Sequence, residues 1–129
     1  IIGILAALAI PRFKVFQAKA RQSEAKQTLS LIYKMEQTYA VGNSVFVNVS
    51  TPAGCNGVAN DIGLNFPDCK KNFYTYEVTD ASRTSFTATA TSGDTTENKV
   101  YPGCASDVWV TDQDNYLRAT NDSTKTCTK

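Results

Sequence analysis

The side chains best suited to chemistry in this 129-residue chain are its four cysteines, because the sequence contains no histidine. They stand at Cys55, Cys69, Cys104 and Cys127. No two of them have the close C-x-x-C spacing that zinc sites use, and a mixed Cys/His zinc site is impossible without histidine. An even number of cysteines in a small domain, without metal-site spacing, is typical of the disulfides found in exported proteins. The cysteines therefore predict two disulfide bonds.

Four cysteines allow three pairings. We favour Cys55 with Cys69 and Cys104 with Cys127, because each pair then closes a local loop. In the chain-entropy model, each such loop would contribute about 3 kcal/mol to stability.

The remaining reactive residues do not form a catalytic pattern. Without histidine, Ser/His/Asp and Cys/His arrangements are excluded, and the sequence has no P-loop or G-x-G-x-x-G stretch. Asp112 and Asp114 could begin a calcium loop, but no glycine or downstream glutamate completes an EF-hand pattern. A plain hairpin turn is the better interpretation of these two carboxylates. The sequence predicts neither an enzyme nor a bound cofactor.

The first eleven residues, IIGILAALAIP, are uncharged and almost entirely apolar. A helix needs about 20 residues to cross a bilayer, so this stretch is too short to span one. It also lacks the charged start and the Ala-x-Ala end of a secretory signal. We expect it to be the remaining part of a longer hydrophobic segment. The alternative, a buried N-terminal helix, would need a larger core than a chain of this length readily supplies.

Charge is distributed unevenly along the chain. Residues 12–40 carry six basic and two acidic side chains, a net charge of +4, whereas residues 41–129 carry seven basic and ten acidic ones, a net charge of −3. The basic cluster could face acidic surfaces of neighbouring molecules or simply form a solvated helix face. The acidic character of the larger part argues against binding to nucleic acid.

The apolar segment is predicted to be helical, with weak points at Gly3 and Pro11, where the helix should bend or loosen. Beyond Pro11, residues 12–40 contain strong helix formers and predict a long continuous helix. Apolar residues then recur at helical spacing, which predicts that residues 29–40 pack on a sheet. Residues 14–26 are more polar and are expected to stand out from the globule, leaving Phe13 and Phe16 available for contacts with other molecules. The apolar stripe comprises Ala18, Ala25, Leu29, Ile32 and Tyr39, widened by Leu31 and Met35.

The second half of the chain shows alternating patterns. Strands are predicted at residues 73–79, 84–91, 108–110 and 116–118, after a long irregular connection over residues 41–72. Together with the helix they predict one α+β domain: a long N-terminal α-helix packed on a four-stranded antiparallel sheet.

The exact residue sequence of the N-terminal segment identifies a protein family more specifically than its hydrophobicity does. IIGILAALAIP, followed by an aromatic residue and QAKARQSEAK, resembles the N-terminal helix of the type IV pilins and their pseudopilin relatives, over about Ile1–Glu36. A looser resemblance continues through Ile62-Gly63, Tyr74-x-Tyr76-x-Val78 and Asp107-x-Trp109 before the last cysteine. In that family the mature chain begins further upstream, with an N-methylated phenylalanine. The resemblance therefore implies an N-terminally truncated pilin, with Cys104 and Cys127 closing a C-terminal disulfide loop.

The resemblance also implies a function. Residues 1–28 would form the part in the filament core and membrane, and residues 29–129 the globular head. The chain would be a subunit of a helical pilus for adhesion, motility or DNA uptake, exported to the cell surface after waiting in the inner membrane with a periplasmic head. Its partners would be other pilins, an assembly platform with its ATPases and a prepilin peptidase. A type II secretion pseudopilin is the alternative. The implied assembly residues are Ile1, Ile2, Gly3, Ile4, Leu5, Leu8, Ile10, Pro11, Phe13 and Phe16.

Overall fold

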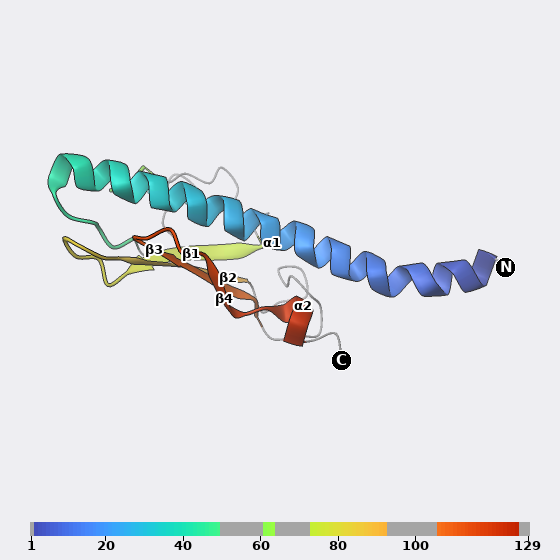
Figure 1. The fold of residues 1–129 in the computed structure, drawn as a ribbon. Coiled ribbons are helices and arrows are strands. Elements are labelled where there is room, and N and C mark those ends of the chain that lie inside the picture. The colour runs from blue at the N-terminus through green and yellow to red at the C-terminus, as the bar shows by residue number, and fades with distance from the viewer. Residues whose placement is uncertain (1, 50–60, 64–72, 93–105, 127–129) are drawn as a thin grey trace.

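One long helix dominates the computed structural model, which describes residues 2–49, 61–63, 73–92 and 106–126. Helix α1, Ile2–Asn43, has 42 residues and is therefore about 63 Å long at 1.5 Å per residue. Figure 1 shows its first part reaching well beyond the sheet. The helix continues through Pro11 without interruption, so the predicted weak point does not end it. All four cysteines, and with them both predicted disulfides, lie outside the described residues.

The sheet has four antiparallel strands in the order β1-β2-β3-β4, as a simple meander. The strands are β1, Tyr74–Thr79; β2, Thr87–Ser92; β3, Val108–Asp112; and β4, Arg118–Asn121. The four predicted strands are present, but β2 begins three residues later than predicted, and β4 shares only Arg118 with the predicted strand at 116–118. A shift in register between Val108 and Trp109 marks an irregularity in the β3–β4 pairing. α1 lies across one face of this sheet (Figure 1).

The core forms between one stripe of α1 and the inward face of the sheet. On α1, Ala18, Ala25, Leu29 and Ile32 of the predicted stripe are fully buried. Tyr39 and Met35 are only partly buried, and Leu31, which was predicted to widen the stripe, is exposed, so that part of the prediction was wrong. The strands contribute alternate residues, with β1 buried at every second position from Tyr74 and β2 at Ala88 and Ala90. The four-residue spacing that continues this helix stripe also buries two polar residues, Gln22 and Glu36.

The contact between α1 and the globule begins earlier than the sequence indicated. Residues 14–26 were expected to stand away from the sheet, yet Ala18, Gln22 and Ala25 are buried. The expectation was wrong because the polar residues in this stretch occupy the other faces of the helix, and Gln22 finds hydrogen-bond partners on the sheet side. The part of α1 that extends beyond the globule therefore lies before Ala18, and the helix packs on the sheet from Ala18 onward.

Two local features complete the fold. α1 ends at Asn43, where Ser44 adopts a left-handed conformation (φ 61°) and its N–H donates to the Ala40 carbonyl at 2.7 Å. A short helix, α2, Ser123–Thr126, follows β4 and was not predicted. Its sequence signal is Asp122, a residue type that favours the position before a helix.

Candidate assembly helix and its attachment to the sheet

The predicted assembly residues from Ile2 to Phe16 lie on the part of α1 that extends beyond the sheet (Figure 1). Within this part, Gly3 is exposed, and Ile4 and Phe16 each expose 68% of their surface. Ile1 lies outside the described residues. The structure describes the helical backbone at Ile2, Leu5, Leu8, Ile10, Pro11 and Phe13, but not their side chains.

Apolar exposure continues further along the free face of α1. Leu31 is 44% exposed and Val41 is 88% exposed, although the same helix buries its opposite stripe completely. An apolar side chain in water forgoes the favourable free energy of burial, about 25 cal/mol per Å². α1 therefore has one face that packs on its own sheet and another that offers apolar side chains to the surroundings.

The attachment of α1 to the sheet depends on polar contacts as well as on the apolar core, and the fullest of these contacts is made by Asp107. Its carboxylate is completely buried. Oδ2 accepts from the Tyr74 hydroxyl and from Trp109 Nε1, both at 2.5 Å. Oδ1 accepts from Gln22 Nε2 at 3.1 Å and from the backbone and hydroxyl of Ser123 at 2.8 and 3.1 Å. One side chain thus connects α1, β1, β3 and α2.

The Tyr74 hydroxyl is held in its neutral form by this arrangement. Burial raises the pKa of Tyr74 far above its ordinary value, and the hydrogen bond to the Asp107 carboxylate raises it further. The hydroxyl is therefore a permanent donor to Asp107 at physiological pH.

Glu24 attaches α1 to the beginning of β1. Its Oε2 accepts from the backbone N–H of Phe73 at 3.1 Å and lies 3.5 Å from the Tyr76 hydroxyl. The guanidinium of Arg21 lies over the Phe73 ring, 4.6 Å from its centroid. Desolvation raises the pKa of Glu24, and these hydrogen bonds oppose that rise without cancelling it.

Glu36 attaches α1 to the segment that follows the helix. Its Oε2 accepts from the Val47 backbone N–H at 3.0 Å, while its Oε1 is buried without a hydrogen-bond partner among the described residues. The side chain is completely inaccessible to water. Desolvation therefore raises the pKa of Glu36 above its ordinary value of 4.5, with the Val47 bond opposing the rise.

Replacing Glu36 with Gln is expected to make the protein more stable at pH 7. Because the folded-state pKa is raised, the native state holds its proton more tightly than the unfolded chain does. The stability from this proton is fully present below the unfolded pKa of about 4.5 and is lost as pH rises through the higher folded pKa. Each unit of elevation corresponds to about 1.4 kcal/mol, and Gln remains neutral while it can still accept from Val47.

Urea unfolding between pH 4 and pH 8 measures this effect. The advantage of Glu36→Gln should vanish near pH 4 and grow as pH rises. Glu77→Gln, at an exposed position on β1, should show little change at any pH. Parallel stability profiles for Glu36→Gln and the parent would contradict the assignment.

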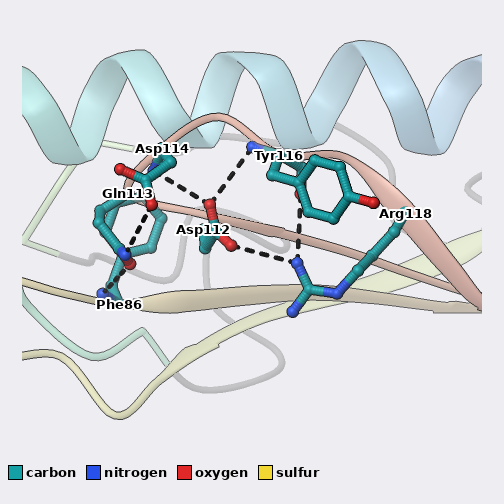
Figure 2. A network of polar contacts seen from close by, with 6 residues as sticks. All are labelled: Phe86, Asp112, Gln113, Asp114, Tyr116 and Arg118. Atoms are coloured by element: carbon teal, nitrogen blue, oxygen red, sulfur yellow. Dashed lines mark hydrogen bonds and ion pairs between the residues drawn. The ribbon is translucent and has the colours of Figure 1, made fainter.

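Asp112 and Asp114, the candidate calcium ligands, lie in the β3–β4 turn (Figure 2). Asp112 Oδ1 accepts from the backbone N–H groups of Asp114 and Tyr116 at 3.0 and 3.3 Å, and its Oδ2 pairs with Arg118 at 3.1 Å. Partial desolvation raises the pKa of Asp112, but these bonds outweigh it and leave the pKa below the usual value. Both oxygens therefore already serve the turn. Among the described residues no group of three or more Asp, Glu, His or Cys side chains could hold a metal.

Sequence reasoning missed the polar residues that attach α1. Gln22 and Glu36 occupy positions of the apolar stripe, four residues after Ala18 and Ile32, and a polar residue at such a position is the available signal. Asp107 was quoted with Trp109 as part of a resemblance, without a role. Its role depends on contacts between segments 33 and 85 residues apart, which no local pattern reveals.

In the described part of the chain, no helix combines the length and apolar character needed to cross a bilayer. No protein-family model matches the sequence, and no solved structure matches it either.

Comparison with characterised proteins gives a more informative result. The chain is 39% identical over 82 residues to the type IV major pilin protein PilA of Myxococcus xanthus (strain DK1622). The match covers 64% of this chain and spans 32% of the relative's length. The long N-terminal helix on an antiparallel sheet is a pilin-like arrangement. Over these 82 residues the chain is therefore homologous to a type IV major pilin, of which it spans about a third.

Proposed function

We propose that this protein is a structural subunit of a type IV pilus, polymerising with copies of itself or related pilins. The observation that carries the proposal is the contrast between two parts of α1. One stripe, from Ala18 to Ile32, is fully buried on the sheet, while the part before it extends beyond the sheet and exposes Ile4 and Phe16. Such a helix can bind a sheet and other helices at the same time. The 39% sequence identity to a type IV major pilin over 82 residues supports the same role.

The physical basis of assembly would be helix association. Before assembly the apolar end of α1, within residues 1–28, would lie in the inner membrane, with residues 29–129 on the periplasmic side. In the filament the same apolar end would pack among neighbouring helices. Both surroundings are apolar, so transfer between them changes little in hydrophobic free energy. An assembly platform with its ATPases would then supply direction, after a prepilin peptidase has processed the N-terminus.

The exposed cations of α1 are compatible with close packing of such subunits. Lys19, Lys26 and Lys34 are exposed on the helix, and Glu77 and Asp80 are exposed at β1 and just after it. Opposite charges on different surfaces of one subunit favour contacts between copies, at a range set by the Debye length of about 8 Å in physiological salt. Filaments at the cell surface would serve adhesion, motility or DNA uptake.

The proposal predicts where the protein is found. An antibody raised against the folded head should label filaments sheared from the surface of the native organism and viewed by electron microscopy. Deleting the gene should remove these filaments, and a plasmid copy should restore them. Cell-associated antigen, with normal filaments but impaired protein secretion in the deletion strain, would instead identify a type II secretion pseudopilin.

A further inference from the structure

One amide of α1 donates to two carboxylates in the C-terminal part of the described chain. Gln22 Nε2 donates to Asp107 Oδ1 at 3.1 Å and to Asp122 Oδ1 at 2.8 Å. Gln22 is 3% exposed and Asp107 is completely buried. A carboxamide nitrogen carries two hydrogens, so it can donate one to each carboxylate. These two hydrogen bonds are called the Gln22 bridge below.

Both carboxylates of the Gln22 bridge also hold the first turn of α2. Asp107 Oδ1 accepts from the backbone N–H of Ser123 at 2.8 Å, and Asp122 Oδ1 accepts from that of Thr124 at 3.0 Å. The hydroxyls of Ser123 and Thr124 donate to the same two oxygens, at 3.1 and 2.6 Å. A helix of four residues is far too short to be stable alone. These two acceptors therefore hold the first turn of α2, together with the backbone bond from Lys125 to the Asp122 carbonyl.

Two carboxylates placed this close repel each other when both are ionised. A neutral amide that donates to both reduces the cost of their approach and their desolvation, because each charge then receives a hydrogen bond. Without that amide, the least costly response is for Asp122 to move away into water, since it is less buried than Asp107. Asp122 would carry the start of α2 with it.

We propose that the Gln22 bridge couples α2 to α1, so that residues 121–126 stay folded only while α1 keeps its observed position along the sheet. A shift of α1 by one helical turn moves a side chain by about 5.4 Å, well beyond hydrogen-bond reach. A partner that displaces α1 near Gln22 would thus release the C-terminal segment. The contacts of β1 and β2 with Leu29 and Ile32 are apolar and tolerate small shifts better.

Hydrogen exchange in the full chain tests this coupling. Gln22→Met keeps the length of the side chain and removes both donors. We expect it to lower protection at the amides of Ser123 and Thr124 by about tenfold or more, the scale of one lost hydrogen bond to a charged group. Protection in β1 and β2 should change far less. Gln27→Met, the same substitution at an exposed position of the same helix, should leave α2 unchanged.

A second variant makes the effect depend on pH and does not rely on Gln22→Met folding well. Gln22→Glu places a third carboxyl beside Asp107 and Asp122. The other titratable groups near this site, among the described residues, include the neutral Tyr74 hydroxyl, Lys125, Glu24 and Tyr76 beside Tyr74, and Lys26 over the Trp109 ring. In the parent, burial raises the pKa of Asp122, but hydrogen bonds from Thr124 and Gln22 outweigh this and leave the pKa below its usual value. Near pH 4.5 the introduced carboxyl can be protonated and donate to one of the two carboxylates, whereas at pH 7.5 it is ionised and repelled by both.

The expected result for Gln22→Glu is a protection factor at Ser123 and Thr124 that falls by about tenfold between pH 4.5 and pH 7.5, while the parent shows no such fall. Unchanged protection of α2 in both variants would overturn the proposal. So would an equal loss at every amide of the sheet, because that pattern means general destabilisation and no specific coupling. Loss confined to α2, with Gln27→Met like the parent, supports it.

Discussion

Replacing Asp107 with Ala is expected to lower the free energy of unfolding by about 4 kcal/mol, within the range seen when one partner of a buried polar network is removed. The carboxylate accepts five hydrogen bonds from four residues: Gln22, Tyr74, Trp109 and Ser123. Its removal leaves their donors in a site that water does not reach. Each buried donor without a partner costs about 1–3 kcal/mol, and partial relaxation recovers some of the sum.

Chemical denaturation monitored by the fluorescence of Trp109, the single tryptophan, measures this loss. Because Trp109 donates to Asp107, the emission of the folded variant should also change. Asp107→Asn should be intermediate, since it keeps one acceptor oxygen but presents an NH₂ group to neighbouring donors. Asp114→Ala, which removes an exposed carboxylate from the β3–β4 turn, provides the control. A loss below about 1 kcal/mol in Asp107→Ala would show that the surrounding donors find other partners.

The elements of the fold followed from local patterns because their periodicity is strong. The alternation Tyr74, Tyr76 and Val78 placed β1 and its buried face correctly, and the helical spacing of Leu29 and Ile32 identified the part of α1 that packs on the sheet. In both cases a run of apolar residues at one spacing can be buried in only one way. The type and order of the elements were therefore accessible from sequence.

The attachment of the helix was not accessible in the same way. The polar character of residues 14–26 suggested an exposed helix, because a hydropathy pattern treats Gln22 as solvent-facing. Its burial is favourable only because Asp107 and Asp122 accept from it, and those residues lie 85 and 100 positions away. Similarly, the short helix α2 depends on side chains outside it. Features held by contacts distant in sequence leave little local signal.

The candidate assembly residues and the candidate metal ligands could both be predicted from local sequence. The resemblance identified Ile4 and Phe16 as assembly residues, and the structure places both on the exposed part of α1. Because these side chains are exposed, they contribute little burial free energy to the fold of the subunit itself. Asp112 and Asp114 were predicted to lie in a hairpin turn, and the structure places both in the turn between β3 and β4.

A buried and an exposed phenylalanine should respond differently when each is replaced with alanine. Phe86 is 1% exposed and packs against the rings of Phe46 and Tyr33, with centroids 4.8 and 6.5 Å away. Phe86→Ala should therefore cost about 3–5 kcal/mol, from lost burial and the cavity that remains. Phe16 is 68% exposed on α1. Phe16→Ala should change the stability of the subunit by no more than about 0.5 kcal/mol.

Filament yield per amount of folded subunit should show the opposite order, with the larger loss in Phe16→Ala and the smaller in Phe86→Ala. If Phe16 packs against other subunits, Phe16→Ala removes apolar area from each contact along the filament, and a small loss per subunit is repeated at every step of assembly. Sheared filaments should then fall severalfold while the cellular level of the subunit stays the same. Phe86→Ala should lower both together, because too little subunit folds. Normal filament yield from Phe16→Ala, at normal subunit levels, would mean that this exposed side chain is not part of the assembly surface.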